Sequence, residues 1–268
     1  MGDDLGDEWW LDPSDTSKND ENDDLAGKSE IRGVSHTKRK AESENNEGGQ
    51  KSSKRKRRTK QKISEYLSKS TPKPATPKEV LTKMDGYFKQ KLSPLELEDL
   101  QLAESDFLEH NASSLPLSSY LETAVPRWGR DLEAKRPKET KTCLLLVISS
   151  SARRAVDVNR DANDFKGKQC VSAKLFSKHM KIQEQTSFLA KNRTQFAVGT
   201  PNRIAALLQQ EALNLSGTRY VVLDWNWRDV KFRRMCDIPE LRADLFGLFE
   251  KYIIPQAKNG HKLKIGIF

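Results

Sequence analysis

The sequence predicts an α/β fold in which a mostly parallel sheet lies between two layers of helices. From residue 141 onward, short apolar runs alternate with longer segments whose apolar residues have helical spacing. The run CLLLVI at 143–148 is apolar throughout, as is typical of a strand buried on both faces of a parallel sheet. Because crossover connections between parallel strands are right-handed, this alternation predicts an open three-layer α/β domain.

The expected elements follow one another regularly. The sequence predicts strands at 141–148, 170–176, 195–200, 219–225 and 263–268. It predicts helices at 151–165, 179–192, 201–213 and 239–253. In the first of these helices, one side carries Ala155, Val158, Ala162 and Phe165. Pro201 suits the first position of the third helix, and we expect Thr200 to cap it.

Residues 76–140 are predicted to form a helical lead-in or partner-binding segment. Their apolar residues have helical spacing in two pieces, which are separated at Ser93-Pro94. Ser93 is expected to cap the second piece, with Pro94 in its first turn. The second piece is expected to carry one apolar side, formed by Leu95, Leu97, Leu100 and Leu102. This helix would either cover the sheet or dock on a partner.

Residues 1–75 are predicted to be a disordered tail, because they contain too few apolar residues to offset the chain entropy lost on folding. Residues 1–30 hold eleven acidic and two basic residues, whereas residues 31–62 hold twelve basic and three acidic residues. Two basic clusters separated by thirteen residues resemble a bipartite nuclear localisation signal, which a nuclear import receptor would read. The clusters consist of Lys38, Arg39, Lys40, Lys54, Arg55, Lys56, Arg57 and Arg58. The same side chains could also contact nucleic acid phosphates.

The charge balance points to a polyanionic partner. The formal net charge is +9, and the two halves of the tail cancel, so residues 63–268 carry this excess. Such a basic folded part suggests nucleic acid, and the alternative is a solvated basic surface. The three cysteines stand far apart, which argues against a disulfide framework and against a zinc site. Apolar runs are far shorter than the ~20 residues of a membrane helix. We therefore expect a soluble protein of a reducing compartment, with no signal peptide and no membrane partner.

The stretch VVLDWNWRDV at 221–230 raises the question of a nucleotide site, because Asp224 follows a predicted strand. A phosphate loop of the form G-x-x-x-x-G-K-[ST] is absent, since the GKS at 27–29 has Asn22 in place of the first glycine. Trp225 can neither transfer a proton nor orient water. We therefore predict no cofactor, no metal and no enzymatic activity. Asp224 is interpreted as capping a turn, and Trp225 and Trp227 as packing or partner-binding surface.

The order of these elements resembles the first RecA-like lobe of DEAD-box RNA helicases over residues 141–268, about half of the chain. VISSSARRAVDV at 147–158 resembles the helicase Ia region, and VGTPNRIAALL at 198–208 resembles the Thr-Pro-Gly-Arg element, with Asn202 in place of glycine. VVLDWNW at 221–227 stands at the Asp-Glu-Ala-Asp position. The resemblance implies a single degenerate lobe without the phosphate loop (Walker A). Its Walker B position would be occupied by Asp224, Trp225, Asn226 and Trp227, with Trp225 in place of the catalytic glutamate.

Together with the acidic-then-basic tail and KLSPLELEDL at 91–100, this degenerate lobe is similar to the Cms family of eukaryotes. That resemblance implies a nuclear and nucleolar subunit of the 90S small-subunit pre-ribosome, the particle that contains U3 snoRNA. The implied partners are pre-ribosomal RNA and 90S pre-ribosome proteins. Because the corresponding helicase loops contact the RNA backbone, the residues implied to bind RNA are Arg153, Arg154, Thr200 and Arg203. The competing interpretation is that Arg203 pairs with an acid and Thr200 only caps its helix.

Three functions remain open at this point. The leading one is a non-catalytic assembly factor for ribosome biogenesis that binds RNA and proteins. The second is an RNA-stimulated ATPase or helicase of the DEAD-box type, which would need substitutes for the missing lysine and glutamate. The third is a nuclear protein that uses its basic segment on DNA or chromatin.

Overall fold

The computed structural model describes residues 73–134, 136–258 and 263–268. The predicted disorder of the tail and the predicted nuclear localisation signal therefore fall outside the described residues, apart from residues 73–75. Ala75, which the sequence assigns to the tail, is completely buried. The packed part of the chain thus includes residues just before position 76.

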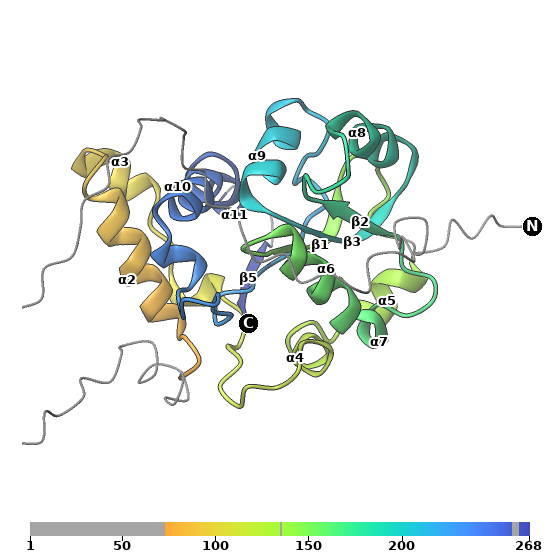
Figure 1. Cartoon of the computed structure of the whole chain (residues 1–268), viewed down its shortest axis with the longest axis horizontal. Helices are drawn as coiled ribbons and strands as arrows, with labels where there is room; N and C mark the ends of the chain where they lie inside the picture. The colour runs from red at the N-terminus through yellow and green to blue at the C-terminus, as the bar shows by residue number, and fades with distance from the viewer. Residues whose placement is uncertain (1–72, 135, 259–262) are drawn as a thin grey trace, which may run out of the picture. The chain divides into compact units, whose positions relative to one another are not determined.

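A five-stranded parallel sheet forms the centre of the domain, in the order β2-β3-β1-β4-β5 (Figure 1). The strands are β1 (Cys143–Ile148), β2 (Ser172–Leu175), β3 (Thr194–Gly199), β4 (Tyr220–Leu223) and β5 (Lys264–Ile267). In the central strand, Leu146 lies between Ala197 of β3 and Val221 of β4. All six residues of β1 are buried, as the apolar run predicts. The predicted parallel α/β fold is confirmed, and the strands are one or more residues shorter than expected at several ends.

One face of the sheet is covered by α4 (Leu117–Ala124), α5 (Trp128–Glu133), α6 (Ala152–Asp161) and α7 (Asn163–Lys166). Their apolar residues form one cluster with strand residues such as Val147, Phe196 and Val222. The side predicted for the helix at 151–165 is buried at all four positions, Ala155, Val158, Ala162 and Phe165. The segment nevertheless forms two helices, because α6 ends at Asp161 and the next residue, Ala162, leaves the helical backbone conformation.

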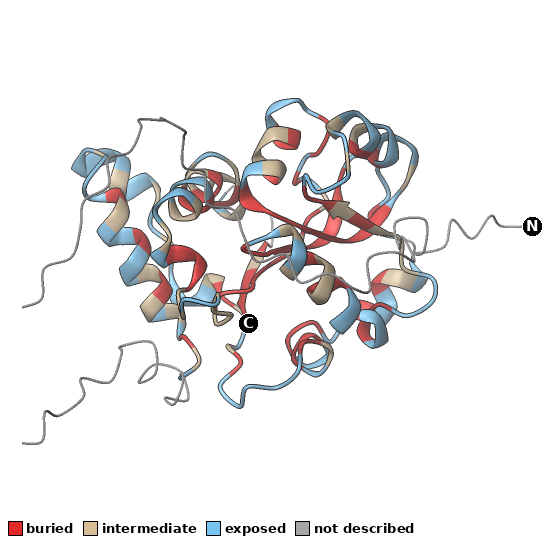
Figure 2. Cartoon of the chain, in the orientation of Figure 1, coloured by how far each residue is buried: buried red, intermediate tan, exposed pale blue. Residues whose placement is uncertain are grey.

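The other face is covered by α2 (Pro77–Phe88), α8 (Ile182–Lys191), α9 (Pro201–Gln209), α10 (Pro239–Leu248) and α11 (Ile254–Lys258). Two buried clusters, one on each face, make the predicted three layers (Figure 2). The helix predicted at 239–253 changes to a π-helix, η3 (Phe249–Ile253), before α11. Pro255, in the first turn of α11, has no N–H to donate to the preceding turn, which interrupts the regular helical hydrogen bonding there.

The lead-in contributes to this core. Val80, Met84 and Phe88 of α2 are buried, and the Phe88 ring lies 6.0 Å from that of Phe246 in α10. The predicted Ser93 cap is confirmed, since Ser93 and Glu96 form a reciprocal capping box at α3 (Pro94–Asp99).

The apolar side predicted for 95–102 is wrong in part. The helix α3 ends at Asp99, and Leu95 is 76% exposed, whereas Leu97, Leu100 and Leu102 pack partly against the core. After the short turn η1 (Glu104–Asp106), Phe107 forms a parallel bridge with Ile265 at the β5 edge of the sheet.

Gly199 ends β3 where the backbones of β2 and β3 approach each other closely. A Cβ atom at this position would lie 2.3 Å from the carbonyl oxygen of Leu175, far inside contact distance. The backbone N–H of Thr200 then donates to the same Leu175 carbonyl at 3.1 Å. A glycine is therefore needed to hold the start of α9 against the end of β2.

Candidate nucleic-acid interface

The carboxyl ends of β1, β3 and β4 lie side by side at one edge of the sheet, where ligands bind in open α/β folds. Ser149–Ser151 follow β1, Thr200 follows β3 and Asp224 follows β4. The Ser151 hydroxyl caps α6 by accepting from the backbone N–H of Arg154 at 3.2 Å. The hydroxyls of Ser149 and Ser150 are buried without a hydrogen-bond partner among the described residues.

Asp224 forms a bidentate ion pair with Arg154. The Arg154 Nε donates to one carboxylate oxygen at 2.8 Å and its Nη2 to the other at 2.9 Å. The Asp224 side chain is inaccessible to solvent, and that of Arg154 is 14% exposed. Burial raises the pKa of the Asp224 carboxyl, and the hydrogen bonds from Arg154 oppose this rise. The expectation that Asp224 caps a turn is wrong, because both of its oxygens accept from a guanidinium on α6.

The Arg154 guanidinium is enclosed by further groups. Its Nη1 lies 3.7 Å from a carboxylate oxygen of Asp161, and its centre lies 5.8 Å from the Trp227 ring. The Arg154 side chain therefore makes its contacts within the domain. Its neighbour Arg153 is exposed, so only one of the two arginines predicted to contact RNA near the Ia loop projects into solvent.

Trp225 and Asn226 both serve the packing of the domain. Trp225 is completely buried in the cluster shared with α9 and α10, which confirms the packing interpretation of this side chain. The Asn226 Oδ1 accepts from the backbone N–H of Ala75 at 2.8 Å, and the Asn226 N–H donates to the Phe268 carbonyl at 2.8 Å. Asn226 thus fastens the start of the lead-in to the sheet, a role that sequence spacing does not signal.

Replacing Asn226 with alanine is expected to lower the free energy of unfolding by about 1–2 kcal/mol, because the buried Ala75 N–H loses its acceptor. Urea denaturation followed by circular dichroism measures this change. Asn226→Asp keeps an acceptor oxygen for the Ala75 N–H and is expected to lose less stability than Asn226→Ala. Equal losses for both variants would contradict the assigned role of Asn226.

At the start of α9, the side chain of Asn202 makes the capping hydrogen bonds. Its Oδ1 accepts from the Thr200 hydroxyl at 2.8 Å and from the Arg203 backbone N–H at 2.7 Å. Thr200 does stand at the N-cap position, but its hydroxyl accepts no hydrogen bond from the helix. The expectation that the Thr200 side chain caps α9 is therefore wrong.

Arg203 is held by Gln185 of α8. The Arg203 Nη1 donates to the Gln185 Oε1 at 3.1 Å. Gln185 is 2% exposed, and its Nε2 donates to the carbonyls of Lys174 and Phe176 at 2.8 and 2.9 Å. The expectation that Arg203 pairs with an acid is thus wrong, because its partner is a neutral amide fixed by two backbone carbonyls.

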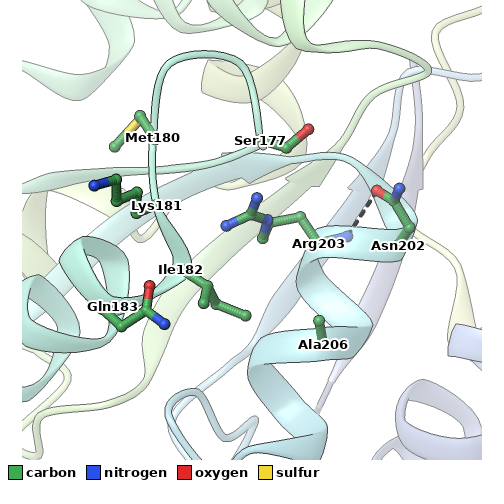
Figure 3. A pocket seen from close by; sticks show the side chains of 8 residues that line it. All are labelled: Ser177, Met180, Lys181, Ile182, Gln183, Asn202, Arg203 and Ala206. Carbon is green, nitrogen blue, oxygen red and sulfur yellow. Dashed lines mark hydrogen bonds between the residues drawn. The ribbon is translucent and has the colours of Figure 1, made fainter.

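A cavity of about 550 Å³ lies beside Arg203, between the loop that enters α8 and the first turns of α9 (Figure 3). Two of its lining residues, Lys181 and Arg203, are basic and none is acidic. The full lining consists of Ser177, Met180, Lys181, Ile182, Gln183, Asn202, Arg203 and Ala206. Sequence reasoning missed Lys181 and Met180, whose only signal is that the loop at 177–181 is basic and follows a strand end. It also missed Gln185 of α8, which has no such signal.

The structure brings the predicted site residues together in two groups. Arg154, Asp224 and Trp227 meet at the ends of β1 and β4, whereas Thr200 and Arg203 meet at the start of α9 through Asn202, which was not predicted as a site residue. Within the described ranges, no three His, Cys, Asp or Glu side chains are grouped so as to hold a metal ion. No helix in the described part of the chain is both long and apolar enough to cross a membrane.

Comparison with known proteins places the chain in a family. The family model described as "CMS1: U3-containing 90S pre-ribosomal complex subunit" matches residues 34–268. Protein CMSS1 of Xenopus laevis is 39% identical and Protein CMSS1 of Homo sapiens 38% identical, each over the full length of both chains. Among solved structures, a DEAD box protein from Methanococcus jannaschii aligns with 72% of this chain and 47% of its own, at 14% identity and a TM-score of 0.40. The predicted membership is confirmed, and the chain belongs to the CMS1 family of U3-containing 90S pre-ribosomal complex subunits.

Proposed function

We propose that this protein is a non-catalytic subunit of the 90S pre-ribosome, which promotes small-subunit assembly by binding pre-ribosomal RNA and neighbouring proteins. The family description supports the particle and the process. The observation that carries the non-catalytic part is the ion pair of Asp224 with Arg154, together with the burial of Trp225.

The Asp224–Arg154 pair argues against the role that a carboxylate has in ATP hydrolysis. That role requires an oxygen that faces Mg²⁺, while a neighbouring group positions the attacking water. Both Asp224 oxygens already accept from one guanidinium, and removing that partner would leave a buried charge. The next side chain, Trp225, is enclosed in the core and cannot position water.

The β5 edge of the sheet also supports the proposal that the protein does not hydrolyse ATP. A phosphate loop joins a strand to a helix and cradles phosphates with glycine-rich backbone. Here the strand-like Phe107 beside β5 is joined to α4 by residues 108–116, which contain neither glycine nor lysine. The Asn111 side chain closes this loop, since it donates to the Leu115 carbonyl at 2.8 Å and accepts from the Leu115 N–H at 2.7 Å. The Asn111 side chain therefore makes its hydrogen bonds within the loop.

RNA contact is proposed for the exposed Arg153 and for the start of α9 with Thr200 and Arg203. The excess of basic residues after position 62 supports a polyanionic partner. Arg154 is assigned a supporting role, in which its ion pair holds α6 against the end of β4. The two basic clusters, residues 38–40 and 54–58, are proposed to direct import to the nucleus and nucleolus through an import receptor.

Crosslinking in cells, followed by sequencing of the bound nucleic acid, tests the proposal. We expect enrichment of pre-ribosomal RNA. Enrichment of DNA would favour a chromatin-associated protein instead, and enrichment of neither would refute nucleic acid binding. Titration of a fluorescent ATP analogue tests the catalytic alternative, and saturable binding at micromolar protein would contradict the non-catalytic assignment.

Arg203→Glu is expected to weaken RNA binding and to lower the slope of log affinity against log salt by about 0.7, the contribution of one phosphate contact on a single strand. Fluorescence anisotropy with a labelled single-stranded RNA at several KCl concentrations measures both quantities. Arg193→Glu is the matched control, because Arg193 is exposed at the opposite end of β3. An equal effect of both variants would indicate general charge attraction and no specific contact at Arg203.

A further inference from the structure

We propose that the cavity beside Arg203 binds one unpaired nucleotide of RNA, with the base inside the cavity and a phosphate on the Arg203 guanidinium. This inference rests on the proposed RNA-binding function, and it specifies the nucleotide site. The proposed function involves contact with the RNA backbone, and this inference adds a cavity that binds the base.

The cavity is shallow and largely open to solvent, and it is large enough to seat a base. Its volume is about 550 Å³. Ile182, the first residue of α8, points toward Ala206 of α9, and the Arg203 side chain extends beside them toward the loop that carries Met180 and Lys181 (Figure 3). Apolar groups therefore form one side, where the face of a base can pack, and the arginine plane offers a second stacking surface.

Arg203 is prepared to hold an anion. Its Nη1 is occupied by Gln185, which leaves Nη2 and Nε without a hydrogen bond among the described residues. Gln185 cannot turn away readily, because its amide also donates to two backbone carbonyls. A guanidinium fixed in this way binds a phosphate by two parallel hydrogen bonds with little loss of side-chain entropy.

The surrounding charge favours the same ligand. Lys181 adds a second positive charge to the lining. The nearest acid in sequence, Glu184, accepts from the Lys181 backbone N–H at 3.2 Å and does not line the cavity. The Asn202 Oδ1 is already used twice, so only its amide hydrogens remain to donate to a base. A ligand with an anionic part, a flat apolar part and acceptors at its edge fits this combination, and a nucleotide has all three.

Methionine-methyl NMR on the full chain tests the site directly. With methyl-labelled methionine, each of the four nucleoside monophosphates is titrated in turn, with ribose 5-phosphate and orthophosphate as comparators. We expect a saturable shift of the Met180 signal, while Met84 and Met235, which are buried elsewhere in the core, stay in place. No shift of Met180 at millimolar nucleotide, or equal affinity for ribose 5-phosphate, would overturn the base pocket.

Variants test the geometry. Ala206→Leu fills the cavity, and Arg203→Gln removes the cation, so each is expected to weaken nucleotide binding at least tenfold. Arg193→Gln removes a distant exposed cation and is expected to leave binding unchanged. Thermal unfolding of each variant excludes loss of folding as the cause. Unchanged binding by both cavity variants would refute the assignment.

Two oligomers test whether the cavity takes a nucleotide of RNA or a free nucleotide. One is a short oligouridylate, and the other is a chain of the same length with abasic riboses. We expect at least tenfold weaker binding of the abasic chain. Binding of mononucleotides without binding of the oligouridylate would overturn the RNA assignment in favour of a free-nucleotide site. If the oligouridylate binds through the cavity but crosslinking in cells finds no pre-ribosomal RNA, the proposed function fails while the nucleotide site stands.

Discussion

Arg154→Ala is expected to lower the free energy of unfolding by about 3–5 kcal/mol, because it leaves the Asp224 carboxylate buried without its partner. Asp224 is 1% exposed, and Arg154 supplies both of the hydrogen bonds that its oxygens accept. The loss therefore reflects an unsolvated charge far more than the net contribution of an intact ion pair.

Urea denaturation at neutral pH measures the loss, and two variants serve as controls. Arg153→Ala changes the exposed neighbour and is expected to cost at most ~0.5 kcal/mol. The double variant Arg154→Leu with Asp224→Leu removes both charges and is expected to recover most of the stability, since buried pairs are replaceable by apolar groups of similar volume. A loss below ~1 kcal/mol for Arg154→Ala would mean that Asp224 reaches water or another partner.

The stability of Arg154→Ala should also depend on pH in a defined direction. Burial already raises the pKa of the Asp224 carboxyl, and removing the guanidinium removes the influence that lowers it. The folded variant then binds a proton at a higher pH than the unfolded chain does. Its stability deficit is therefore expected to shrink as the pH falls below neutrality and to be largest above the pKa of the folded state. A deficit that is constant from neutral pH to about pH 4, near the reference pKa of an aspartate, would contradict this cause.

The order of strands and helices could be predicted because it depends on local patterns. CLLLVI and the apolar side of 151–165 are visible without knowledge of any partner. The pairing order β2-β3-β1-β4-β5 could not be read in this way, because it depends on contacts between distant segments. The predicted extent of the helix at 95–102 was wrong for a related reason. Four leucines at helical spacing do not reveal where the core ends, and Leu95 faces solvent.

The positions of the candidate site residues were predictable, but their partners were not. A residue that directly follows a parallel strand must lie at the sheet edge, so Asp224 and Thr200 are located by sequence. Arg154, the partner of Asp224, lies 70 residues away from it in the sequence. Ala75, the partner of Asn226, lies 151 residues away from it. Side-chain orientation decides these pairings, and a linear pattern carries no information about it.

Trp225→Ala is expected to lower the free energy of unfolding by about 3–5 kcal/mol, because it opens a large cavity among residues packed against α9 and α10. Trp225→Phe is expected to cost less, about 1–2 kcal/mol, since the lost volume is small and the indole N–H has no described partner to lose. Chemical denaturation followed by far-UV circular dichroism measures both, and avoids the change in tryptophan fluorescence. Val230→Ala, at a side chain that is 93% exposed, should be neutral.

Trp225→Glu separates the structural role of this position from a catalytic one. The substitution restores the residue type that the DEAD-box resemblance implies, but it places a carboxylate where the side chain has no access to water. We expect a destabilised protein without ATP hydrolysis. Hydrolysis that rises above the level of the unchanged protein would show that the carboxyl end of β4 is still a nucleotide site. No hydrolysis, together with a large loss of stability, would agree with a packing role for Trp225.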